Sequence, residues 1–165
     1  MNRKLLAISL ALSSVTWGCA PRVKNVTNLP PGVSLSQAQT WDTAVANLHK
    51  IASTVSTFRK TLTDLHTAMF NGGPVLSDEF YADALRTIAR IDQAELSAEA
   101  VLRQTPQNFT ASAKQQVGAL VQQISTELQH LNTTGATGIK NPKSLTEVNN
   151  LLGEISSIVA LILAL

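Results

Sequence analysis

Charged and aromatic residues are both scarce in this sequence. Charged side chains make up 15% of the chain and aromatic ones 4%. A polar surface must therefore be built mainly from Ser, Thr, Asn and Gln. The few charges are scattered, and no basic stripe is present that could follow a phosphate backbone,. We therefore exclude nucleic acid as a partner. The apolar share of 44% is still large enough for one hydrophobic core in a chain of 165 residues,.

Motifs that carry enzyme chemistry are also missing. The sequence has no G-x-S-x-G elbow, no phosphate-binding glycine loop and no H-E-x-x-H element,. Its three histidines, His49, His66 and His130, are far apart and lack the i, i+4 spacing of helical metal ligands,. His49 is expected to flank an apolar stripe in contact with solvent. We expect no catalytic residues, no cofactor and no metal site, and hence no enzyme.

The single cysteine, Cys19, stands at the end of an N-terminal export pattern. Arg3 and Lys4 form a short basic region, and residues 5–15 form an apolar one. This arrangement is typical of a secretory signal peptide, and the apolar stretch is too short for a membrane span, which needs about 20 residues. Removal of Arg3 and Lys4 leaves 11 basic residues, which equals the 11 acidic ones. The exported domain would therefore carry no net charge.

The residues around the cysteine, Val15-Thr16-Trp17-Gly18-Cys19, resemble the lipobox of bacterial lipoproteins. Gly18 and Cys19 match that motif, whereas Thr16 and Trp17 depart from its usual Leu and small residue. The resemblance implies that residues 1–18 are a lipoprotein signal peptide. It also implies that Cys19 becomes the lipidated first residue, anchored by acyl chains such as palmitate. Lipidation would also consume a thiol that has no partner for a disulfide.

One further inference depends on this resemblance, and one rival interpretation competes with it. Ala20 follows the cysteine, where an Asp would favour retention in the inner membrane, so the resemblance favours the outer membrane. The rival interpretation is ordinary signal cleavage after Ala20, with Gly18 and Ala20 as the small residues. Pro21 would then follow the cleaved bond, a position that ordinary signal peptidases tolerate poorly.

Residues 19–35 are predicted to form a tether, and residues 36–165 are predicted to form a helical domain. Pro21, Pro30, Pro31 and Gly32 interrupt any periodicity before residue 35,. At about 3 Å per residue, this tether could hold the domain roughly 40 Å from a membrane. The domain is therefore expected on the periplasmic side, held off the bilayer.

Apolar residues at intervals of three and four predict four helices in the domain. The first spans residues 36–70 with the clearest, coiled-coil-like stripe, which runs from Ala44 to Met69 and is stopped by Asn71-Gly72-Gly73-Pro74,. The second begins after the N-cap Ser77 and ends near Gln104, with Glu95 interrupting its apolar face. The third begins near Thr110 and breaks in the run 133–138. The fourth begins with the capping box Ser144-Leu145-Thr146-Glu147.

An all-α antiparallel bundle of about four helices is the fold that these helices predict. A protruding coiled-coil stalk formed by the first helix is the alternative. Residues 155–165 are apolar nearly all round, which predicts a helix wrapped by its neighbours, a surface for self-association or contact with a membrane,. We reject a full membrane span because it would bury Glu147, Asn149, Asn150 and Glu154.

Taken together, the sequence predicts a lipid-anchored protein of the bacterial cell envelope with a structural or protein-interaction role. Its expected partners are the membrane, through the acyl chains on Cys19, and another envelope protein or a second copy of the chain. The alternative function is a carrier that holds an apolar small molecule or lipid between its helices. The first helix also carries many hydroxyl side chains, which predict a low-charge face that could dock a partner: Thr40, Thr43, Ser53, Thr54, Ser56, Thr57, Thr61, Thr63 and Thr67.

Overall fold

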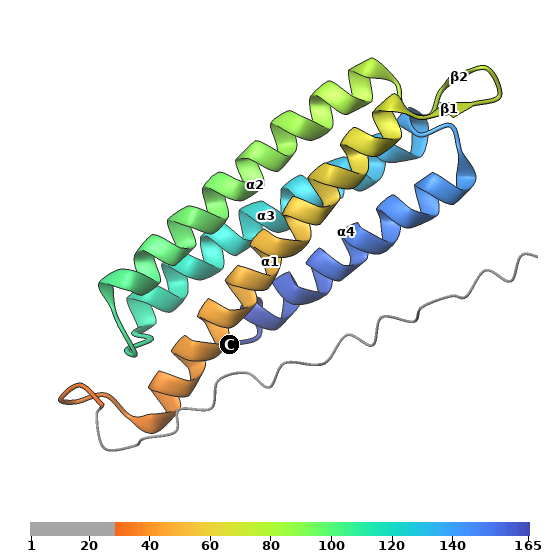
Figure 1. Ribbon diagram of the computed structural model, residues 1–165. Coiled ribbons are helices and arrows are strands. Elements are labelled where there is room, and N and C mark those ends of the chain that lie inside the picture. The colour runs from red at the N-terminus through yellow and green to blue at the C-terminus, as the bar shows by residue number, and fades with distance from the viewer. Residues whose placement is uncertain (1–28) are drawn as a thin grey trace, which may run out of the picture.

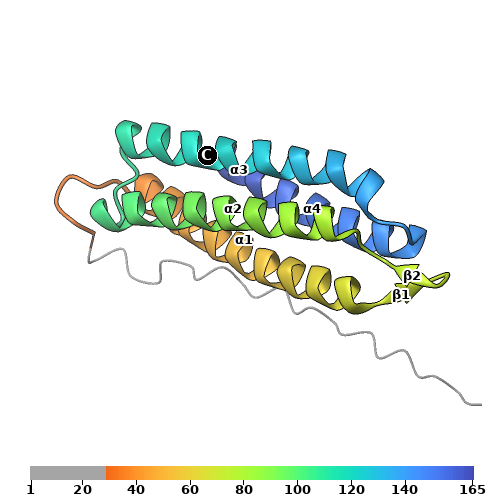
Figure 2. The same ribbon diagram turned by 90° about the horizontal axis from the view of Figure 1, so that it is seen from above.

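A computed structural model describes residues 29–165, which form the antiparallel four-helix bundle that the sequence predicts (Figure 1). The helices are α1 (Leu35–Thr67), α2 (Asp78–Gln104), α3 (Ala111–Gly138) and α4 (Pro142–Leu163). Each helix packs against its neighbour in the chain, and α4 closes the bundle against α1. The view from above shows the four helices aligned, with a small hairpin projecting at one end (Figure 2).

The core lies along the axis of the bundle and draws on all four helices. Its largest fully buried side chains include Phe58 and Leu62 of α1, Ile91 of α2, Ile124 of α3 and Ile155 of α4. Buried positions of α1 extend from Ala38 to Leu62. The first helix is therefore part of the bundle over most of its length, and the stalk alternative is wrong.

The first helix is shorter than predicted because a β-hairpin follows it. Strands β1 (Met69–Phe70) and β2 (Gly73–Pro74) pair around a two-residue loop in which Asn71 and Gly72 have φ angles of 51° and 81°. These positive angles are typical of the type I′ turn that an Asn-Gly pair favours between antiparallel strands. Met69, which we predicted on the apolar helix stripe, lies in β1 and is 69% exposed.

The third helix does not break at residues 133–138, as we predicted, but continues to Gly138. The two glycines of this run face the ring of Phe80 on α2. A Cβ atom at Gly138 would stand 2.3 Å from the Cβ of Phe80, whereas one at Gly135 would make an ordinary contact at 3.6 Å. The glycines therefore permit close packing of α3 against α2, and the hydrogen-bonded helix around them outweighs their low helix propensity.

Capping of the fourth helix also differs from the prediction. Asn141 is the N-cap: its side-chain oxygen accepts hydrogen bonds from the backbone N–H groups of Lys143 and Ser144 at 2.9 and 3.4 Å. Pro142 occupies the first turn, where a missing N–H costs nothing. Ser144 is buried inside the helix rather than capping it. The capping box of this protein lies instead at Ser34 and Gln37, at the start of α1.

Backbone contacts join the two connections at the hairpin end of the bundle. Leu76, after the hairpin, forms an isolated β-bridge with Ile139, after α3. The N–H of Ser77 donates to the carbonyl of Gly138 at 3.0 Å, and Ser77 also caps α2 as the sequence predicts. At the opposite end, the indole N–H of Trp41 on α1 donates to the carbonyl of Leu102 on α2 at 2.9 Å. Both ends of the bundle are thus fixed by specific hydrogen bonds.

Candidate functional site

Cys19, the one site residue that the sequence predicts, lies outside the described residues. The described chain begins at Leu29 and passes through a turn in which the N–H of Val33 donates to the carbonyl of Pro30 at 3.1 Å. Gly32 adopts a φ of 81° in this turn. The chain then enters α1 at Leu35. Any segment anchored at Cys19 therefore joins the bundle at the end where α1 begins.

Each of the three histidines lies near a carboxylate of α2. Nε2 of His49 lies 3.0 Å from Glu99, and Nε2 of His130 lies 2.7 Å from Asp83. The ring of His66 stacks on Tyr81 with a centroid separation of 3.9 Å. His49 is exposed, as predicted, but it is also paired. Within residues 29–165, no three His, Cys, Asp or Glu side chains gather closely enough to hold a metal ion.

A buried acidic pair marks the junction of α1 and α2. Glu95 and Glu99 are only 4% and 9% exposed, although they lie one turn apart on α2. Glu99 accepts a hydrogen bond from Arg103 and faces His49 of α1. Oε1 of Glu95 is buried and has no hydrogen-bond partner in the described part of the chain. A buried carboxyl oxygen without a hydrogen-bond partner destabilises the folded state when the group is ionised.

The surroundings of Glu95 raise its pKa from 4.5 to about 7. Burial is the largest cause, because it penalises the charged form,. The negative charge of Glu99, a hydrogen bond to Glu99 and the charge of Asp92 act in the same direction, whereas Arg103 opposes them. The carboxyl group therefore exchanges its proton near neutral pH. The sequence signal for this pair was the interruption of the apolar face by Glu95.

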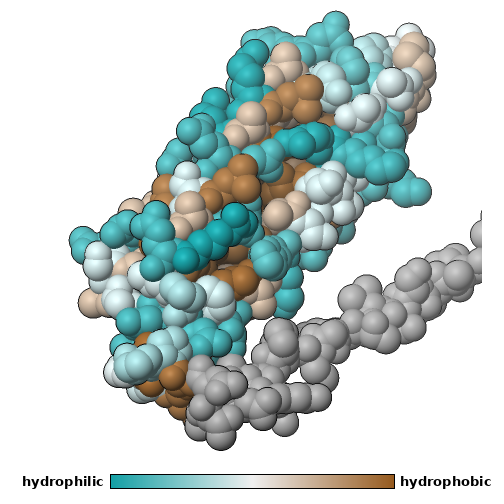
Figure 3. All heavy atoms as spheres, turned by 60° about the vertical axis from the view of Figure 1, so that its left-hand side comes forward, coloured by the Kyte–Doolittle hydropathy of each residue, from teal (hydrophilic) through white to brown (hydrophobic). Residues whose placement is uncertain are grey.

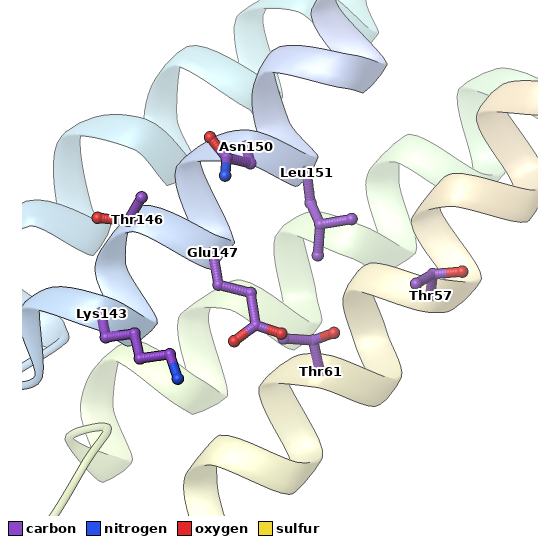
Figure 4. Close-up of a pocket in the computed structure, with 7 residues that line it drawn as sticks. All are labelled: Thr57, Thr61, Lys143, Thr146, Glu147, Asn150 and Leu151. Atoms are coloured by element: carbon purple, nitrogen blue, oxygen red, sulfur yellow. The ribbon is translucent and has the colours of Figure 1, made fainter. Parts of the chain in front are cut away.

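An open groove between α1 and α4, with a volume of about 720 Å³, is the candidate docking site (Figure 4). Figure 4 shows Glu147 and Leu151 of α4 directed toward α1, where Thr61 and Thr57 line the opposite wall. Six of its seven lining residues are polar in type, although most of the surface exposed in the groove is apolar. The lining residues are Thr57, Thr61, Lys143, Thr146, Glu147, Asn150 and Leu151.

The hydroxyl groups of this groove are partly occupied by the helices themselves. Thr57 donates to the carbonyl of Ser53 at 3.2 Å, and Thr146 donates to that of Pro142 at 3.0 Å. Lys143, Glu147 and Asn150 are exposed, and these side chains offer charge and an amide to a partner. Thr57 and Thr61 belong to the predicted hydroxyl-rich face, whereas Thr54 of the same prediction is buried.

The apolar fourth helix is less covered than a wrapped helix would be. Its inner face, from Val148 to Ile162, packs into the core, but Leu161 and Leu163 remain 57% and 41% exposed. Apolar patches, brown in Figure 3, also interrupt the polar surface on another face, the one on the left-hand side of Figure 1. By length and composition Pro142–Leu163 could cross a membrane, and 33% of its most apolar stretch is buried in the bundle. It also carries the exposed residues Glu147 and Glu154, so we interpret it as a bundle helix,.

The sequence does not reveal that Glu95 and Glu99, one turn apart on α2, are both buried, or that α4 contributes to the groove, because both features depend on how the helices meet. No family model, curated protein or solved structure matches this chain.

Proposed function

We propose that this protein is a lipid-anchored component of the bacterial cell envelope whose helical bundle has a structural or protein-binding role. The observation that carries the proposal is the single cysteine at position 19, which follows an export pattern in a lipobox-like setting,. Several acyl chains on one residue would hold the protein durably on a membrane. We further propose the outer membrane, because Ala20 follows the cysteine, and a bundle that faces the periplasm.

The fold supports a tethered domain. The described chain enters the bundle at one end only, through the turn before α1 (Figure 1). The bundle buries an apolar core of its own from all four helices. Such a domain does not need the bilayer to cover its core, so the anchor would set its location rather than its fold.

Lipidation can be tested by growing cells with a palmitate analogue and comparing the wild type with Cys19→Ser. We expect label on the wild-type protein and complete loss of label in the variant, because the thioether requires the thiol. The variant should also accumulate as a longer precursor that keeps residues 1–18, because removal of the signal peptide before Cys19 follows lipidation. Label that persists in Cys19→Ser, or that never enters the wild type, would disprove the anchor.

We propose the groove between α1 and α4 as the surface that binds a protein partner. It presents Lys143, Glu147 and Asn150 beside the partly buried Leu151. Exposed polar groups around a small apolar patch resemble the rim and core of a transient protein interface. The partner is expected to be another envelope protein or a second copy of this chain.

A photo-crosslinking amino acid at Asn150, in the full chain in cells, tests this groove. We expect a discrete adduct, identified by mass spectrometry, that falls several-fold when Thr61→Arg blocks the opposite wall. The matched control is the same probe at Gln123, which is exposed on α3 outside the groove. Equal adducts from both positions, or none from Asn150, would refute a docking role for this surface.

A further inference from the structure

The buried carboxyl groups of Glu95 and Glu99 lie on the side of α2 that packs into the bundle. They belong to the same buried face as the core residues Ile91 and Leu102. Apolar side chains normally fill such positions, because an ionised carboxylate in an apolar interior is strongly destabilising unless it is paired. Oε1 of Glu95 has no hydrogen-bond partner within residues 29–165. The packed bundle is therefore destabilised when both groups are charged.

Few positive charges face this acidic pair from α2 and α1. On α2, Arg103 donates to Glu99, whereas Asp92 adds a further negative charge near Glu95. On α1, Nε2 of His49 lies 3.0 Å from Glu99. An imidazolium at this position would neutralise one of the two carboxylates, and loss of its proton would remove that compensation.

The other helices add no compensating charge at this level of the bundle. α3 has no ionisable residue between positions 114 and 127. α4 has only Glu154 after position 147, and Glu154 is exposed. Arg59 of α1 is already paired with Asp92. A proton on one of the two carboxyl groups is therefore the simplest way to keep the pair buried.

The start of α1, residues 35–49, is the segment that depends most on this pair, and we call it the leading segment. α1 has 33 residues and α4 has 22, so α1 begins well beyond the end of α4 (Figures 1 and 2). Trp41 donates a hydrogen bond to the carbonyl of Leu102 on α2. Within the described residues, the ion pair of the leading segment is that of His49 with Glu99, a member of the acidic pair itself.

The other contacts of α2 do not involve the acidic pair. Arg90 of α2 lies 2.8 Å from Glu127 of α3, and Asp83 of α2 lies 2.7 Å from His130 of α3. Toward the hairpin, Arg59 holds α1 to α2 independently of Glu95. Repulsion between the two carboxylates is therefore relieved most easily by movement of the leading segment.

We propose that Glu95 and Glu99 form a proton-operated latch on the leading segment of α1. With a proton shared between the two carboxyl groups, Glu95 is hydrogen-bonded to Glu99 and the leading segment stays packed on α2. When the proton is lost, two buried carboxylates one helix turn apart repel each other, and release of the segment exposes them to water. This regulatory device goes beyond the proposed binding role and does not depend on the lipid anchor.

The direction of the pH effect follows from the two forms. The pKa of Glu95 is about 7 in the packed bundle, and it should return toward 4.5 once water reaches the group. The closed form therefore binds more protons than the open form between these values, and it is disfavoured as pH rises through 7. With these two pKa values, the ratio of open to closed form increases about tenfold between pH 6 and pH 8.

Thiol labelling at a buried position tests the latch. The full-length chain with Cys19→Ser receives a single new cysteine, either Ala44→Cys in the leading segment or Ala84→Cys on α2 near the hairpin; both alanines are fully buried. With a slow thiol reagent, the labelling rate reports the population of the form that exposes the cysteine. Dividing each rate by the rate in the same protein with Glu95→Gln removes the pH dependence of the thiol itself.

We expect this ratio for Ala44→Cys to rise about tenfold between pH 6 and pH 8. Labelling at 44 should be faster than at 84 and nearly independent of urea at low concentration, because only one segment opens and little surface is exposed. Ala38→Cys, at another fully buried position of the segment, should behave like Ala44→Cys. Glu154→Gln should leave all rates unchanged.

Two results would overturn the latch. The first is a ratio for Ala44→Cys and Ala38→Cys that does not change with pH, which would show that Glu95 does not control the segment. The second is equal labelling at 44 and 84 with the same steep dependence on urea. That result would show that the bundle opens only as a whole.

Discussion

Replacing Gly138 with alanine is expected to lower the free energy of unfolding by about 3 kcal/mol, because overpacking a well-packed contact typically costs 1–3 kcal/mol. The new methyl group would stand 2.3 Å from the Cβ and 2.4 Å from the Cγ of Phe80. These atoms lie close to the backbone of α2, so they cannot move aside by a simple change of rotamer. Either α2 and α3 separate locally or the ring of Phe80 leaves its site.

Urea unfolding followed by circular dichroism measures this effect, and Gly153→Ala is the matched control. Gly153 lies in α4, and a Cβ atom there meets nothing within 4 Å. Alanine in this exposed helical position should raise stability by about 0.5–1 kcal/mol. The double variant Gly138→Ala with Phe80→Ala should lose less than the sum of the two single losses, since both changes act on one contact. Equal stability of the Gly138→Ala and Gly153→Ala proteins would show that α2 and α3 do not pack as described.

Glu95→Gln is expected to stabilise the bundle above neutral pH and to leave its stability nearly unchanged at pH 4.5. The pKa of Glu95 rises from 4.5 to about 7 on folding, so the native state binds more protons than the unfolded state between these values. Stability conferred by the protonated form is therefore fully present at low pH and is lost as pH rises through 7. Glutamine keeps the shape of the side chain and cannot ionise.

The full change in pKa would correspond to about 3 kcal/mol. We expect a loss of about 2 kcal/mol in the wild type between pH 4.5 and 8. Denaturant unfolding across this range should show the decline in the wild type and a flatter curve in Glu95→Gln. Glu154→Gln, which alters an exposed carboxylate of α4, should follow the wild-type curve. If the free energy of unfolding fell equally with pH in the wild type and in Glu95→Gln, ionisation of Glu95 would not destabilise the folded protein, and the account would be wrong.

The number and order of the helices followed from the sequence because local signals and apolar periodicity agreed. Ser77 caps α2 as predicted, and the stripe of α1 placed Leu48, Ile51 and Phe58 in the core. Such signals depend on residues three or four positions apart, and these distances are fixed within a helix.

Tertiary contacts decided the features that the sequence did not reveal. Glycines at 135 and 138 predicted a break, whereas the ring of Phe80, distant in the sequence, gives them a packing role within α3. Asn141 and Ser144 both offered N-terminal caps, and the chain uses Asn141. For the candidate groove, Thr57 and Thr61 belonged to the predicted hydroxyl-rich face, but their pairing with Glu147 depends on the packing of α4 against α1.

The N-terminal peptide of the mature protein tests the central claim most directly. Mass spectrometry of the protein purified from bacterial membranes should find a first residue at Cys19, modified by a diacylglyceryl group, with residues 1–18 removed. An unmodified cysteine, or a mature chain that begins at Pro21, would contradict the lipid anchor.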